Sequence, residues 1–98
     1  MFGLSDSAVK LLKDYFTSQP QIQEVRVYGS RAMGTQEPGS DIDLAIWTTA
    51  ERNISGHIKS DLDELPLPYL FDVTDYTRVK NVALKAHVDR VGKALFRR

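Results

Sequence analysis

The stretch from Gly29 to Asp43 constrains the fold of this chain more than any other part of the sequence. It begins where one alternating apolar pattern, Val25 and Val27, ends, and it runs into a second alternating pattern at Ile42. Alternation with a period of two is typical of a half-buried strand, and the glycines and proline between the two patterns interrupt any regular element. The sequence therefore predicts two strands joined by a glycine-rich loop.

The second strand carries two carboxylates, Asp41 and Asp43, on the face opposite Ile42 and Leu44. Side chains two residues apart point the same way along a strand, about 7 Å from each other. Two acids side by side are costly unless something positive lies there, and a hard divalent cation is the obvious candidate. An EF-hand calcium loop is excluded because apolar residues follow Asp43 where that loop requires oxygen ligands and a glycine. The structural alternative is that Asp41 caps the strand entry and Asp43 is solvated.

Gly29 and Ser30 follow the first strand directly. A glycine there lets the backbone approach a phosphate closely, and the serine offers both its N–H and its hydroxyl, although a plain Gly-Ser turn is the alternative. Arg31 leaves three possibilities open, which are contact with phosphates, an ion pair with a loop acid such as Glu37, or exposure to solvent. Met33 is expected to pack within the loop.

The rest of the chain alternates helical and extended patterns. We expect helices over about 6–18 and 48–64, strands over about 23–28, 41–47 and 69–74, a last helix opened by Asp75 or Thr77, and a short extended segment over 94–96. Candidate N-caps of the 48–64 helix are Thr48, Thr49 and Asn53, and the expected apolar side of the last helix is Val79, Val82, Ala83 and Ala86. This order predicts an α+β (α/β layered) fold, a small mixed β-sheet with helices packed on it.

Three further expectations concern polar residues outside the loop. Asp72 lies in the middle of the apolar run of the third strand, where an acid is costly to bury without a partner. His57 is expected at a solvated or edge position, and His87 is expected at an exposed position. The closing pair, Arg97 and Arg98, is expected only to aid solubility.

The spacing of these motifs resembles that of one family. Gly-Ser, ten residues and then Asp-x-Asp is similar to the signature of the nucleotidyltransferase superfamily related to DNA polymerase β. The sequence Gly-Ser-Arg-Ala…Ser-Asp-Ile-Asp-Leu-Ala resembles the motif of the smallest members of this superfamily, the minimal nucleotidyltransferase (MNT) domains. The resemblance implies a polymerase β palm-like fold, with residues 1–98 as a single MNT domain whose acceptor site comes from another chain.

The resemblance also implies roles for individual residues. Asp41 and Asp43 would hold metal together with a third acid on the next strand, for which Asp72 is at the matching place and Asp75 is the fallback. Gly29 and Ser30 would hold the β- and γ-phosphates of ATP, and Arg31 is a further candidate nucleotide ligand. Two Mg²⁺ ions are expected, with Mn²⁺ possible, since both take oxygen ligands.

Stand-alone MNT proteins of this kind resemble the antitoxins of MNT–HEPN toxin–antitoxin pairs. That resemblance implies a hetero-oligomer with a helical HEPN ribonuclease toxin, which the MNT protein neutralises by transferring AMP from ATP to it. Two alternatives stay open: a catalytically silent antitoxin that acts by binding, and the catalytic subunit of a two-chain antibiotic nucleotidyltransferase.

Composition narrows the class of protein. The 98 residues carry 13 basic and 13 acidic side chains, and this zero net charge argues against a general nucleic-acid binder. There is no cysteine, so disulfides and thiolate metal sites are excluded. No signal-peptide pattern and no apolar run of about 20 residues is present, so a cytoplasmic protein that does not enter a membrane is expected.

Overall fold

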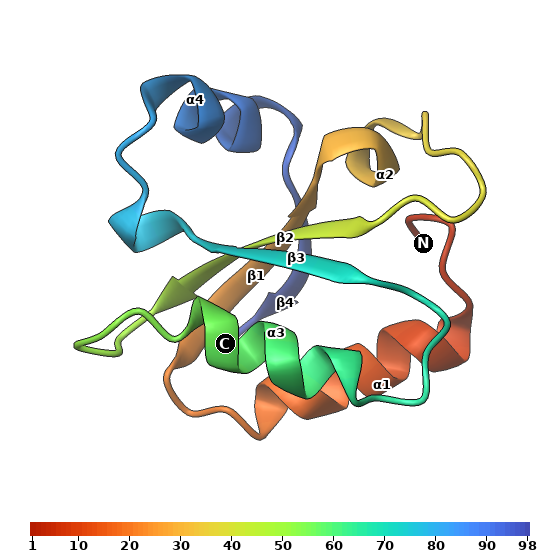
Figure 1. The fold of residues 1–98 in the computed structure, drawn as a ribbon, viewed down its shortest axis with the longest axis horizontal. Helices are drawn as coiled ribbons and strands as arrows, with labels where there is room; N and C mark the ends of the chain where they lie inside the picture. The colour runs from red at the N-terminus through yellow and green to blue at the C-terminus, as the bar shows by residue number, and fades with distance from the viewer.

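The computed structural model describes residues 1–98 and shows one four-stranded sheet with helices on both of its faces (Figure 1). The elements are, in chain order, α1 (Asp6–Thr17), β1 (Ile22–Tyr28), α2 (Gly29–Met33), β2 (Ile42–Thr48), α3 (Ser55–Asp63), β3 (Phe71–Asp75), the 3₁₀ turn η1 (Tyr76–Arg78), α4 (Val82–Val91) and β4 (Lys93–Arg97). The predicted α+β class, with a small mixed sheet, is confirmed. None of the helices is both long and apolar enough to cross a membrane.

The strand order places the two acid-bearing strands next to each other. The order in the sheet is β3-β2-β1-β4, with β1 antiparallel to both β2 and β4. β2 and β3 are parallel, which requires a crossover, and α3 supplies it. In this register Asp43 of β2 lies opposite Asp72 of β3 and opposite Tyr28 of β1.

The main apolar core lies on one face of the sheet, under α1 and α3 (Figure 1). Its fully buried members include Leu12 and Phe16 of α1, Val25 and Val27 of β1, Ile42, Leu44 and Ile46 of β2, and Ile58 of α3. Because side chains alternate along a strand, burial of Ile42 and Leu44 on this face sends Asp43 to the other.

The opposite face carries a much smaller apolar cluster under α4. Its buried members are Tyr28, Ala45 and Val88, and Trp47 stacks on Tyr76 of η1 with ring centroids 4.5 Å apart. Figure 1 shows α4 and α2 on this side, opposite α1 and α3. The acid-bearing face is therefore only partly covered, and its carboxylates keep access to solvent.

Two helix boundaries differ from the expected ones. The helix expected over 48–64 begins only at Ser55, because β2 continues through Thr48 and Thr49 hydrogen-bonds back to Gln21. Of the candidate caps, Asn53 is the one that accepts a hydrogen bond at this helix start, from the Ser55 N–H at 2.9 Å. The loop after β1 also contains a short helix, α2, that the glycine-rich pattern did not predict.

The last helix presents a different side to the sheet from the one expected. It begins at Val82 with Asn81 as N-cap, while Asp75 caps the short turn η1 instead. The predicted apolar side was wrong, since Val82 is 79% exposed and the two alanines are exposed as well. The side that packs on the sheet is formed by Leu84, Val88 and Val91, at positions i, i+4 and i+7.

The end of the chain is a structural clamp rather than a solubilising tail. The segment expected over 94–96 is the strand β4, paired with β1. The guanidinium of Arg98 donates hydrogen bonds to the carbonyl oxygens of Ile22, Phe16 and Gln19 at 2.8–3.1 Å. Arg97 has an exposed side chain with no such bond.

We predict that Arg98→Ala lowers the free energy of unfolding by about 2 kcal/mol, because three carbonyls that close the α1–β1 turn lose a charged donor. Urea denaturation followed by circular dichroism measures the change. Arg97→Ala is the matched control and should alter stability by less than about 0.5 kcal/mol. Equal effects of the two substitutions would contradict a stabilising role for the hydrogen bonds of Arg98.

Candidate functional site

Gly29 and Ser30 begin α2 at the end of β1, and the backbone there is shaped for close approach. Gly29 has φ of 71°, in the left-handed region that favours glycine. A Cβ at this position would overlap the carboxylate of Asp43. The hydroxyl of Ser30 is half-buried and makes no hydrogen bond within the chain, so it is free to meet a ligand.

Asp43 lies at the centre of the site. Burial raises the pKa of its carboxyl above the ordinary value, and the charges of Asp72 and Asp41 raise it further. The imidazole of His87 acts in the opposite direction and lowers the pKa. Asp41 and Asp72, both predicted from sequence, are therefore close enough to Asp43 to repel its charge.

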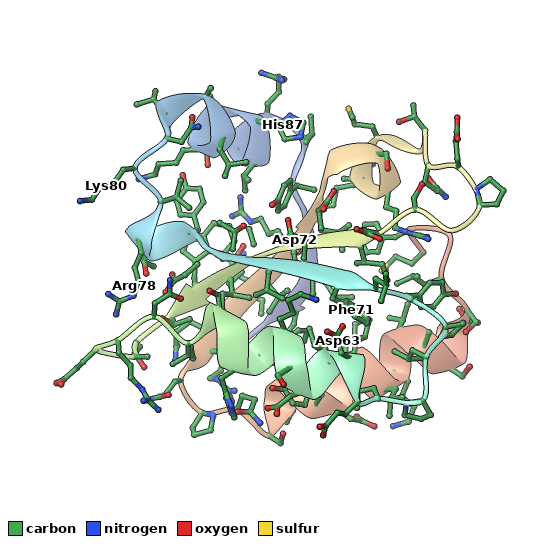
Figure 2. The ribbon with its side chains drawn as sticks, in the orientation of Figure 1. Asp63, Phe71, Asp72, Arg78, Lys80 and His87 are labelled. Carbon is green, nitrogen blue, oxygen red and sulfur yellow. The ribbon has the colours of Figure 1, made fainter.

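The other two acids are more exposed than Asp43. Asp72 is the direct register partner of Asp43 across β2 and β3, and its side chain is exposed (Figure 2). Asp41 precedes β2 and is also exposed. None of the three accepts a side-chain hydrogen bond or forms an ion pair within the chain.

Asp75, the alternative candidate for the third acid, is buried and stabilises the turn η1 instead. It is 3% exposed, and its carboxylate accepts hydrogen bonds from the Thr77 N–H at 3.0 Å and from Arg78 Nε at 3.1 Å. Its register partner is Ile46, three residues along the strand from Asp43. A carboxylate so fully bonded has little left with which to bind a ligand.

The donor chemistry of this site fits a hard divalent cation. Carboxylate oxygens are the ligands that Mg²⁺ prefers, and a cation would relieve the repulsion that raises the pKa of Asp43. As the side chains stand, no group of three or more His, Cys, Asp or Glu is arranged to hold a metal ion. Binding would therefore require rotation of the exposed carboxylates of Asp41 and Asp72 toward Asp43.

Arg31 does not join this group. Its side chain is 6% exposed, and the guanidinium donates to the carbonyl of Ser40 through Nε and Nη2 and to the carbonyl of Phe2 through Nη1. It also lies over the ring of Tyr69, 5.3 Å from the centroid. Neither the ion pair with Glu37 nor the solvated position is found, and the geometry does not support Arg31 as a nucleotide ligand. Met33 in the same helix is 52% exposed rather than packed.

His87 lies close enough to Asp43 to influence its pKa, a position that the sequence analysis did not predict. It lies on α4, is half-buried, and meets the ring of Tyr28 edge to face with centroids 6.0 Å apart. Figure 2 shows it on the same side of the sheet as Asp72. The signal was present in the helical period, because His87 falls on the buried stripe of Leu84, Val88 and Val91.

The comparisons with known proteins identify the family of the chain. The profile described as "Polymerase beta, Nucleotidyltransferase" matches residues 10–98, so the chain belongs to the polymerase β nucleotidyltransferase family. Its fold and family identify it as a nucleotidyltransferase. No curated protein has a sequence that matches the chain significantly.

Among solved structures, the similar ones include antitoxins of the MNT type. The matched chain of a toxin–antitoxin structure with AMP-PNP has 25% sequence identity to this chain. The two superpose with a TM-score of 0.64, and the match covers 91% of this chain and 72% of the other. The MntA–HepT toxin–antitoxin is 21% identical, with a TM-score of 0.64 over 91% and 68% of the two chains. A tri-AMPylated HEPN toxin from Shewanella oneidensis in complex with its MNT antitoxin is 18% identical, with a TM-score of 0.62 over 92% and 73%.

We predict that Asp43→Asn raises the melting temperature at neutral pH in the absence of divalent cations, because it removes a charge that burial and the neighbouring acids both disfavour. The raised pKa means that the folded state holds this proton more tightly than the unfolded chain. The proton on Asp43 therefore stabilises the folded state at low pH. This stabilisation is lost as the pH rises from 3.8, the ordinary pKa of the carboxyl, through the raised pKa of the folded state. Thermal melts from pH 3 to pH 8 should show the melting temperatures of the two proteins converging at the acid end and separating above it, whereas a constant difference would contradict a raised pKa at Asp43.

We predict that Arg31→Lys destabilises the fold by about 2 kcal/mol, because a lysine cannot reproduce the forked donation to Ser40 and Phe2. Urea denaturation measures this loss, and Arg52→Lys at an exposed position is the control. Nucleotide affinity of the folded variant should stay within about twofold of the parent. A loss of affinity without loss of stability would return Arg31 to the nucleotide site.

Proposed function

We propose that this chain is a metal-dependent adenylyltransferase that transfers AMP from ATP to a partner protein. The observation that carries the proposal is the juxtaposition of Asp43 and Asp72 across parallel strands, directly beside Gly29. Mutually repelling carboxylates at a close-approach glycine suit a cation and a phosphate chain together.

The residues divide the work as follows. Gly29 and Ser30 bind the β- and γ-phosphates, the glycine through its close backbone and the serine through its free hydroxyl. Asp41, Asp43 and Asp72 would hold Mg²⁺, of which two ions are expected and for which Mn²⁺ could substitute. When bound, such cations neutralise the charge that develops on the attacking and leaving oxygens.

The reaction is an in-line exchange at the α-phosphorus of ATP. An oxygen of an acceptor hydroxyl forms the new P–O bond, and the bond to the bridging oxygen of the β-phosphate breaks. Pyrophosphate leaves with the electron pair of that bond. The acceptor's proton passes to the carboxylate of Asp72, which is exposed on the open side of the sheet and makes no side-chain hydrogen bond within the chain.

The proposed acceptor is a helical HEPN toxin, which this chain would bind and neutralise as an antitoxin. The support comes from similar structures that hold a toxin–antitoxin with AMP-PNP and a tri-AMPylated HEPN toxin with its MNT antitoxin. The partly covered acid-bearing face leaves room for such an acceptor to approach.

We predict that incubation with a HEPN toxin that this chain binds, together with ATP and Mg²⁺, adds AMP units to that toxin. Intact-mass analysis measures the gain. Asp41→Asn/Asp43→Asn should abolish it, whereas Asp63→Asn on α3, on the far side of the sheet, should leave it unchanged.

A stable, neutralised complex with no mass gain would refute the transfer and establish neutralisation by binding alone. AMP transfer to a small antibiotic but not to the HEPN protein would instead show a subunit of a two-chain antibiotic nucleotidyltransferase.

A further inference from the structure

The acids of the candidate site are not paired with any lysine or arginine side chain. No lysine or arginine forms an ion pair with Asp41, Asp43 or Asp72, and Arg31 is bonded to backbone carbonyls instead. A bound triphosphate nevertheless needs hydrogen-bond donors for its many oxygens. Gly29 and Ser30 can supply only a few of them.

His87 is placed to supply another donor from above the sheet. Its ring stands edge to face on Tyr28, the residue that immediately precedes Gly29 and pairs with Asp43. α4 also contacts α2, the helix that carries Ser30. The imidazole therefore lies over the junction of the phosphate-binding turn and the acid pair.

The charge of the surrounding segment agrees with an anionic ligand. The chain after β3 is strongly basic, with a single acid, Asp89; its basic residues are Arg78, Lys80, Lys85, Arg90, Lys93, Arg97 and Arg98. The acids of the candidate site all lie earlier in the chain. Of the basic residues, Lys85 and Arg90 lie on α4 together with the acid Asp89, so the helix itself carries a small positive net charge, which favours entry of a polyanion such as a nucleotide. Arg78 pairs with Asp75, and Arg98 bonds to carbonyls at the α1–β1 turn.

We propose that His87 is a nucleotide-contacting residue whose imidazole N–H donates a hydrogen bond to a phosphate oxygen of the nucleotide held at Gly29 and Ser30. The inference rests on the proposed function, because it assigns a further ligand residue to the same site. A neutral imidazole retains one N–H, so the contact does not require a charged ring. The edge-to-face packing on Tyr28 fixes the ring plane before the nucleotide arrives.

His87→Phe separates the contact from the packing. Phenylalanine keeps an aromatic ring against Tyr28 but has no N–H to donate. We expect this variant to melt within a few degrees of the parent and to bind AMP-PNP with Mg²⁺ about tenfold more weakly in calorimetry. His87→Gln, which restores an N–H donor, should recover part of that loss.

The chain offers a matched control, because its only other histidine is His57 on α3, which pairs with Asp61 away from the site. His57→Phe should leave AMP-PNP affinity unchanged. In nitrogen-15 spectra of the imidazoles, AMP-PNP should shift the His87 signals and leave those of His57 in place, and the two phenylalanine variants assign the signals.

The possible outcomes test the role of His87 separately from the proposed function. If AMP-PNP binds the parent and His87→Phe equally well, and the His87 signals do not move, the inference is overturned while the nucleotide site stands. If the parent binds no AMP-PNP with Mg²⁺, the proposed function fails and the inference fails with it.

Discussion

The register of β2 is the constraint on which the rest of the structure depends. Ile42, Leu44 and Ile46 are fully buried against α1 and α3, so the strand has only one acceptable placement. A slip of one residue would bury Asp43 in that core and expose the apolar side chains. The same burial that stabilises the domain thus fixes where the central carboxylate points.

This arrangement separates stability from chemistry by the two faces of one sheet. The large core is closed by two helices, while the opposite face has a cluster of only three buried residues, Tyr28, Ala45 and Val88. Repulsion among acids on the second face works against folding, and the first face must offset it. A binding site tolerates such repulsion because a bound cation would neutralise it.

Much of the fold could be read from local pattern. The alternation around Val27 and Leu44 specified two strands, and the helical period of α1 together with Pro20 specified that helix almost to the residue. The resemblance to a known motif directed attention to Asp72 rather than Asp75, and the structure then placed Asp72 beside Asp43. These features depend on spacing within short segments, which sequence records directly.

The features that were missed depend on tertiary contacts. Arg31 turns to the carbonyls of Ser40 and Phe2, and nothing in its local sequence encodes those partners. The packed side of α4 was misjudged because alanines and valines were weighed by type, whereas the sheet selects the stripe that includes Leu84 and Val88. The half-buried position of His87 against Tyr28 was missed through the same error.

The crossover between β2 and β3 has a consequence for how such a chain can change over evolution. The connection from β2 to α3 leaves the sheet after Thr48, at the end of β2 away from Asp43, whereas the connection from α3 to β3 returns to the acid pair, where the Ile42 N–H donates to the Leu70 carbonyl. α3 itself packs on the core face of the sheet (Figure 1). Residues can be inserted or removed in the connection from β2 to α3 without altering the hydrogen-bonded ladder that holds Asp43 opposite Asp72. The far side of the molecule is therefore free to diverge and to acquire new binding surfaces while the spacing of the carboxylates is preserved.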